Sequence, residues 1–189
     1  GDGFDDIVMH SLFPNAQNGV PFEHLVFLNN GDGTFTDFSD ASGLRDVQAG
    51  YFAFADIDDD GDQDIFAGLD LYEYASYRNQ ILINDGSGIF TPTATAVSDT
   101  PYTITAAALF ADFDGDANLD LFVGNGSTMY AWGDFIYAGG GDGSFTDTSN
   151  AFSQSVVQPS NGAVSCDYDN DGDLDIFVST YAVSVENGL

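Results

Sequence analysis

The stretch DIDDDGDQDIFAG occupies residues 56–68, and in it aspartates at alternate positions lead directly into an apolar run. Two further segments align with it without gaps: DFDGDANLDLFVG at 112–124 and DYDNDGDLDIFVS at 167–179. Residues 1–8, GDGFDDIV, match the second half of the same pattern. Equivalent aspartates are 55 to 58 residues apart. Self-similarity at a fixed period predicts a repeat architecture.

A second motif recurs in phase with the first. It reads FLNNGDGTFTD at 27–37, LINDGSGIFTP at 82–92 and YAGGGDGSFTD at 137–147, and its phenylalanines are 55 residues apart. Glycine and asparagine between two apolar runs supply the positive φ of tight β-turns. Each copy therefore predicts a β-hairpin.

Each period is predicted to hold four short strands, in the second repeat at about 51–57, 64–69, 80–84 and 89–93. The chain is therefore expected to be all-β, built from β-propeller blades of four antiparallel strands with Phe and Tyr packed between blades. We predict a single domain over residues 1–189. It is divided into a partial repeat at 1–50, full repeats at 51–106 and 107–161, and a partial repeat at 162–189. These make about 3.4 blades, and because closure takes roughly four to eight, we expect part of a larger propeller.

The charge and composition of the chain exclude several classes of binding partner. The net charge is −29, with Arg45 and Arg78 as the only basic residues, whereas 43% of the residues are hydrophobic. Nucleic acids and anionic membranes attract clustered Lys and Arg, so we exclude both as partners. No apolar run approaches the roughly 18 residues of a membrane-spanning helix. Nearly all the acids are aspartate, which suits tight loops and oxygen-ligand cages; those outside the loops are expected to form a solubilising surface.

Residues 56–64 have the chemistry of a cation-binding loop. Aspartates at positions 1, 3, 5, 7 and 9 can aim at one centre, Gly61 at position 6 allows a sharp turn, and position 7 is expected to offer its backbone carbonyl. Two carboxylates about 4 Å apart repel by about 1 kcal/mol in water and more where water is excluded. No Lys or Arg lies in the loops. All-oxygen ligation favours Ca²⁺ over Zn²⁺, and the looser geometry favours Ca²⁺ over Mg²⁺.

Three full calcium sites and one partial site are therefore predicted. The second loop departs from the pattern, because Ala117 takes position 6 at a strain of about 1 kcal/mol if its φ is positive. An EF-hand is rejected, because position 12 is apolar instead of glutamate and the flanks indicate strands. The candidate ligands are Asp56, Asp58, Asp60, Asp62 and Asp64; Asp112, Asp114, Asp116, Asn118 and Asp120; Asp167, Asp169, Asp171, Asp173 and Asp175; and, in the partial site, Asp2 and Asp6.

The pairing of DxDxDGxxD loops with LxNNGDGTFTD hairpins resembles the FG-GAP/VCBS repeat family, which includes the integrin α-subunit β-propeller. The resemblance covers essentially the whole chain. It implies a propeller of seven or eight blades, calcium in the hairpin between the first two strands of a blade, and an extracellular or cell-surface location. The Phe-Gly and Gly-Ala-Pro signatures of integrin blades are degenerate here, as at 67–69, so integrin-type ligand binding is not implied.

Two functions remain open. The first is a non-enzymatic, secreted calcium-binding module for structure, adhesion or assembly, whose partner is a protein, a glycan or another copy joined through open sheet edges. The second is the scaffold of a carbohydrate-active enzyme such as a polysaccharide lyase. Such an enzyme needs a base and a cation, and His10, His24, Arg45 and Arg78 are isolated in sequence. We therefore favour the first, although hydrolysis by a carboxylate pair stays open.

Three smaller features complete the sequence. Cys166 is the only cysteine, so no intrachain disulfide can form, and its apolar neighbourhood predicts a buried thiol. Asn125 begins an N-glycosylation sequon, and a threonine-rich run at 91–105 is a candidate for O-linked sugar. Sequon tripeptides also occur by chance, and for the threonine-rich run ordinary strand and loop is the favoured interpretation.

Overall fold

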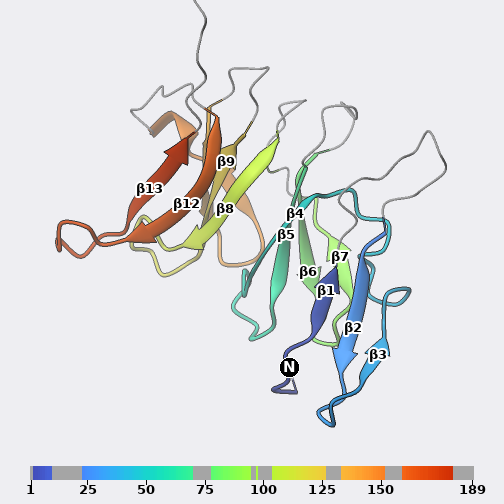
Figure 1. The fold of residues 1–189 in the computed structure, drawn as a ribbon. Helices are drawn as coiled ribbons and strands as arrows, with labels where there is room; N and C mark the ends of the chain where they lie inside the picture. The colour runs from blue at the N-terminus through green and yellow to red at the C-terminus, as the bar shows by residue number, and fades with distance from the viewer. Residues whose placement is uncertain are drawn as a thin grey trace, which may run out of the picture.

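The computed structural model describes residues 2–9, 23–69, 78–94, 97, 104–126, 133–151 and 159–180. Within these ranges the chain forms antiparallel β-sheets arranged side by side, joined by turns and one short 3₁₀ helix (Figure 1). No helix in these ranges has the length and apolar character needed to cross a membrane. The predicted all-β class is confirmed.

The two complete repeats each form a sheet of four antiparallel strands that neighbour one another in chain order. Apolar runs make the strands, and Gly- and Asp-rich turns end them. The sheets comprise β4 (Tyr51–Ala55), β5 (Asp64–Gly68), β6 (Gln80–Asn84) and β7 (Phe90–Pro92), and then β8 (Thr105–Ala111), β9 (Asp120–Asn125), β10 (Phe135–Gly139) and β11 (Phe145–Asp147), with the 3₁₀ helix η2 (Ser149–Ala151) following β11. The four strands predicted for residues 51–93 are confirmed to within two residues at each end.

Partial sheets flank the complete ones. The N-terminal sheet contains β1 (Ile7–Met9), β2 (Leu25–Asn29) and β3 (Phe35–Asp37), and the C-terminal sheet contains β12 (Ser160–Cys166) and β13 (Asp175–Thr180). The register is the same in every repeat, since the last aspartate of each loop pairs with the last residue of the preceding strand. These pairs are Ala55 with Asp64, Ala111 with Asp120 and Cys166 with Asp175.

The core lies between neighbouring sheets. One cluster joins Phe66 and Ile81 of the second sheet to Leu121 and Tyr137 of the third. A second cluster joins β2 to the facing side of the second sheet, with Leu44 fully buried between them. The first strands β4, β8 and β12 also lie next to one another (Figure 1). The prediction that apolar and aromatic residues pack between blades is confirmed for these sheets.

The last sheet differs. Phe177 is 68% exposed, whereas its equivalents Phe66 and Phe122 are fully buried. Cys166 is exposed as well, so the prediction of a buried thiol was wrong. Its equivalents, Ala55 and Ala111, are buried in sheets that have neighbours, whereas no described residue covers Cys166.

A polar residue just before the third strand connects each sheet to the next. Asn79 accepts a hydrogen bond from the Leu69 N–H of its own sheet at 2.9 Å and another from the Thr105 hydroxyl of the next sheet at 3.4 Å. Asp134 accepts one from the Asn125 N–H and another from the Ser160 hydroxyl, both at 2.8 Å. In the first sheet the imidazole of His24 lies 4.8 Å from the ring of Phe52, centroid to centroid. These three residues occupy one repeat position, and each contacts the next sheet.

The sequon at Asn125 falls inside this connection. Asn125 is 2% exposed, and its side-chain oxygen accepts a hydrogen bond from the Ile104 N–H at 3.4 Å. A glycan needs a solvent-accessible asparagine, so the structure argues against modification there. The threonine-rich run lies largely outside the described residues.

Position 6 of each loop adopts positive φ, as expected. The values are 92° at Gly61, 75° at Ala117 and 101° at Gly172. The left-handed region places Cβ close to the following carbonyl, so Ala117 carries strain that glycine avoids.

Replacing Ala117 with glycine is expected to stabilise the fold by about 0.5–1 kcal/mol, because relief of the strain exceeds the extra entropy of the unfolded chain. Gly61→Ala is the mirror change and is expected to destabilise, since an added Cβ at Gly61 meets nothing within 4 Å and only the backbone strain acts. Urea unfolding measures both. Effects of equal sign would contradict the assignment of strain to position 6.

Asp134 predicts a pH dependence. Burial raises the pKa of this carboxyl above its usual value, in spite of hydrogen bonds from the Asn125 N–H and Ser160 that lower it. The folded state therefore holds the proton more tightly than the unfolded state, and the stability from this group is lost as pH rises from about 3.8 through the folded pKa. Asp134→Asn keeps both hydrogen bonds, as Asn79 does in the preceding repeat. We expect the variant to gain stability relative to the wild type across that pH window in urea unfolding, and a constant difference would refute this.

Candidate metal centres

Each loop is wound around its first aspartate. The Asp56 carboxylate accepts hydrogen bonds from the backbone N–H groups of Asp60, at 3.1 Å, and Gly61, at 3.0 Å. Asp112 and Asp167 accept the corresponding bonds in the second and third loops. The short aspartate side chain reaches these donors four and five residues ahead, which explains the tight turn.

The last aspartate closes the loop from the first residue of the following strand. In the first full loop, Asp64 accepts a hydrogen bond from the Ile57 N–H at 2.9 Å through one oxygen and from the Asn84 N–H at 2.8 Å through the other. Asp120 accepts the same two bonds in the second loop, from Phe113 and Gly139. Asp64 is fully buried and Asp120 is 2% exposed. The loop, the strand and the neighbouring hairpin therefore meet at one carboxylate.

Three carboxylates converge in every loop, at positions 1, 3 and 9. One oxygen from each of the three lies within 4.8 Å of the others. The clusters are Asp56, Asp58 and Asp64; Asp112, Asp114 and Asp120; and Asp167, Asp169 and Asp175. Nine of the predicted ligands are thus brought together in three equivalent clusters.

The remaining predicted ligands lie outside these clusters. At position 5, Asp60, Asp116 and Asp171 each accept a hydrogen bond from the N–H of position 7, at 3.0, 2.8 and 3.0 Å. At position 7, the side chains of Asp62 and Asn118 lie against Gly86 and Gly141 of the next hairpin, and Asp173 is exposed.

Asp2 and Asp6, the predicted partial site, belong to no three-carboxylate cluster among the described residues. Asp2 accepts a hydrogen bond from the Phe4 N–H at 3.0 Å, and Asp6 accepts one from the Asn29 N–H at 2.8 Å. Asp6 thus makes the contact to the hairpin that Asp64 and Asp120 make in the full loops.

The first cluster contains a buried carboxylate oxygen that has no hydrogen-bond partner among the described residues. Asp58 Oδ1 is buried and has no hydrogen-bond partner. Burial, and then the neighbouring charge of Asp60, raise the pKa of Asp58, and burial raises the pKa of Asp64 in spite of its two backbone donors. Burial and the charge of Asp120 raise the pKa of Asp114 in the second loop.

A buried acceptor without a donor is costly, and converging carboxylates repel one another. A divalent cation resolves both problems, so the residues present fit calcium. Asp56, Asp58 and Asp64 would hold it, and water, backbone carbonyls and the nearby position-5 carboxylate are the natural sources of the other oxygens in a shell of about six to eight.

The hairpin motif is hydrogen-bonded to the aspartate loop, a contact that was not predicted from the sequence. The Asn84 side chain donates to the Gln63 carbonyl at 3.1 Å and accepts from the N–H groups of Gly86 and Gly88, so it joins the loop to the hairpin. Asn29 makes the equivalent donation to the Asp5 carbonyl. The in-phase recurrence of the two motifs was the signal that could have revealed this contact.

The sequence of the chain is similar to known repeat proteins. A model of the FG-GAP-like repeat matches residues 1–67, 68–123 and 112–178, and each match ends at position 12 of a loop. Cartilage acidic protein 1 of Xenopus tropicalis is 35% identical over 117 residues, which make up 60% of this chain and 17% of that protein. The chain thus spans well under a quarter of its relative's length. Because the matches run through nearly every described strand and loop, the chain belongs to the FG-GAP-like repeat family.

Proposed function

We propose that this chain is a non-enzymatic, extracellular calcium-binding repeat module with a role in structure, adhesion or assembly. The observation that carries the proposal is the convergence of three carboxylates in each of three equivalent loops, one of them with a buried, unpartnered oxygen. Family membership and the name of the Xenopus relative, which refers to cartilage, support the location.

Calcium would act through folding. The three carboxylates of a cluster come from both ends of a nine-residue loop, so they are together only in the folded chain, and the free energy of ion binding becomes free energy of folding. An extracellular module of this kind works with weak sites, because external calcium is about millimolar. The ion would fix the loop between the first two strands and, through Asp64 and Asn84, the neighbouring hairpin.

Two of the basic groups that catalysis would need, His24 and Arg45, have structural contacts. His24 is fully buried, with Nε2 2.6 Å from the Val47 carbonyl oxygen. Arg45 forms ion pairs with Glu23 and Asp40. These contacts support a structural role for His24 and Arg45, whereas Arg78 lines a separate cavity of about 520 Å³. His10 lies outside the described residues.

Removing calcium is expected to lower the melting temperature. A site at a hundredfold excess of ligand over Kd contributes about 2.7 kcal/mol, and each kcal/mol shifts Tm by about 2–4 °C in a chain of this size. Calorimetry in EDTA against millimolar CaCl₂ measures the change. Because the net charge is −29, the control is KCl or MgCl₂ at matched ionic strength, which separates ion binding from general screening. Equal melting in all these buffers would contradict the proposal.

A pair of neutralising substitutions tests the first site. Asp58→Asn removes a carboxylate from the cluster and is expected to weaken calcium binding at least tenfold, while leaving the metal-free fold equally or more stable. Asp59→Asn is the matched control, because Asp59 lies in the same loop but outside the cluster. Asparagine fits its backbone conformation, since Asn170 occupies the same position of the third loop at φ 61° and Asp59 has φ 59°. Calorimetric titration compares them. Equal losses of affinity would show that only net charge matters.

A further inference from the structure

A cavity of about 520 Å³ lies at the end of the second sheet that is remote from its aspartate loop. One wall belongs to the connection between β3 and β4, at residues 43–48, and the other to the place where β6 begins and β7 ends. Because the four strands are antiparallel neighbours in chain order, these strand ends lie opposite the loop at 56–64. The cavity is therefore a different site from the candidate metal centre.

The first wall is fixed by its backbone. The Phe90 N–H of β7 donates a hydrogen bond to the Ser42 carbonyl at 2.8 Å, and His24 Nε2 lies 2.6 Å from the Val47 carbonyl oxygen. At Gly43, where φ is 77°, a Cβ would clash with the Phe90 carbonyl oxygen, so the chain approaches β7 as closely as glycine allows. A wall held in this way needs little ordering when a ligand binds.

The same wall offers oxygen acceptors to the cavity. Leu44, Val47 and Ala49 are buried in the core, whereas Asp46 is exposed and Gln48 is partly exposed. Gln48 Oε1 is nevertheless buried and has no hydrogen-bond partner among the described residues. A buried acceptor without a donor is costly, so this wall favours a ligand that brings a hydrogen-bond donor.

The second wall offers hydrogen-bond donors. Arg78 and Gln80 line it at the start of β6, and Pro92 adds an apolar surface. A guanidinium has five N–H donors in a planar fork, so it can bind a ligand carboxylate beside another partner. Arg78 is one of two basic residues in a chain of net charge −29, whose field repels anions elsewhere. An anionic group is therefore favoured at this guanidinium.

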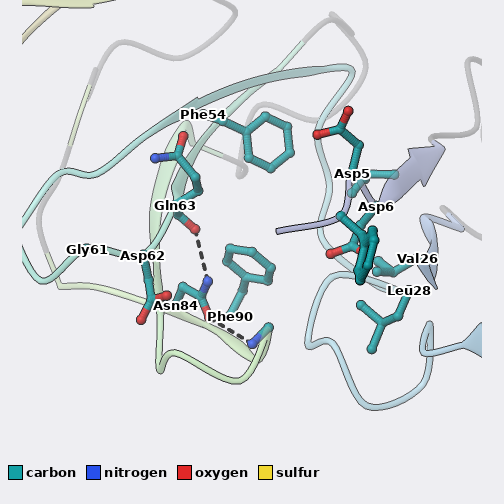
Figure 2. Close-up of a pocket in the computed structure, with 13 residues that line it drawn as sticks. Asp5, Asp6, Val26, Leu28, Phe54, Gly61, Asp62, Gln63, Asn84 and Phe90 are labelled. Atoms are coloured by element: carbon teal, nitrogen blue, oxygen red, sulfur yellow. Dashed lines mark hydrogen bonds between the residues drawn. The ribbon is translucent and has the colours of Figure 1, made fainter. Parts of the chain in front are cut away.

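The cavity in Figure 2 has the opposite charge. It measures about 580 Å³ and lies beside the loop at 56–64, and its charged lining residues are Asp5, Asp6 and Asp62. No Lys, Arg or His of the described chain lines it. The cavity at Arg78 is thus the better of the two for an anion.

We propose that the cavity at Arg78 binds an acidic sugar, such as a uronate residue of a glycan. The sugar carboxylate would pair with the Arg78 guanidinium, and sugar hydroxyls would donate to Gln48 Oε1 and to the Asp46 carboxylate. The buried acceptor is a neutral amide, which favours a hydroxyl over an ammonium group, because burial of a second charge costs more. A cavity of this volume accommodates a pyranose ring, since small-ligand pockets measure roughly 300–1,000 Å³.

This inference goes beyond the proposed function and does not require calcium in the loops. Methyl β-D-glucuronide is the probe, titrated into the isotope-labelled whole chain in millimolar CaCl₂ and followed by heteronuclear NMR. Saturable shifts are expected, centred on residues 43–48 and 78–80. Methyl β-D-glucoside lacks the carboxylate and cyclohexanecarboxylate lacks the hydroxyls, so each is expected to bind at least about tenfold more weakly.

Substitutions test the two walls separately. Arg78→Gln is expected to weaken glucuronide binding at least about tenfold. Arg45→Gln is the matched control, because it removes the same charge from a residue that does not line the cavity, and it is expected to leave the affinity unchanged. Gln48→Met replaces the buried acceptor with a side chain of similar shape. It is expected to weaken binding while the fold stays equally or more stable in urea, so the test remains decisive even if Arg78→Gln unfolds the chain.

Lack of saturable shifts, equal binding of either matched ligand, or equal loss of affinity in Arg45→Gln and Arg78→Gln would overturn the proposal. Shifts centred on residues 56–64 would overturn it as well, because the sugar would then be bound through calcium. Melting in EDTA measures the calcium function by itself, so the failure of one idea is distinguished from the failure of the other.

Discussion

The carboxylate that ends each loop is the contact on which the rest of the structure depends. In the second repeat, Asp64 holds the start of its own loop through Ile57 and the start of the neighbouring hairpin through Asn84. It is also a member of the converging cluster. Burying a charge at the junction of three backbone segments is costly unless donors or a cation compensate. This single requirement links the backbone fold to a cluster of carboxylates that could hold a metal ion.

Local chemistry made much of the fold predictable. Turn residues and the alternation of apolar residues act over a few positions, so they predict local structure. They were sufficient to locate the hairpins and the strands at 80–84 and 64–68. Positions 1, 3 and 9 were among the predicted ligands. Which aspartates form the cluster and which bond the backbone could not be predicted. Whether the Asp60 carboxylate faces the cluster or a backbone N–H depends on the folded conformation of the loop. Contacts between repeats, such as that of Asp134 with Ser160, were also missed, because they join segments 26 residues apart.

Aspartates outside the loops have a more specific role than a solubilising surface. In each described hairpin, one aspartate of the turn accepts a hydrogen bond from a Ser or Thr hydroxyl two residues on, and this bond lowers its pKa. The pairs are Asp32 with Thr34, Asp85 with Ser87 and Asp142 with Ser144. These acids fix turns and stay ionised, which adds negative charge close to the loops. These three acids are therefore part of the architecture of the turns as well as of the charged surface.

The placement of the hydrophobic clusters between neighbouring sheets has a consequence for how the molecule comes apart. Each described cluster spans two adjacent sheets only, so cohesion passes along the array by nearest-neighbour coupling, as in other stacked repeats. The second sheet belongs to both clusters, so disrupting it breaks two interfaces at once. An ion held in its loop at residues 56–64 would therefore protect the packing of both adjoining sheets as well as that of its own.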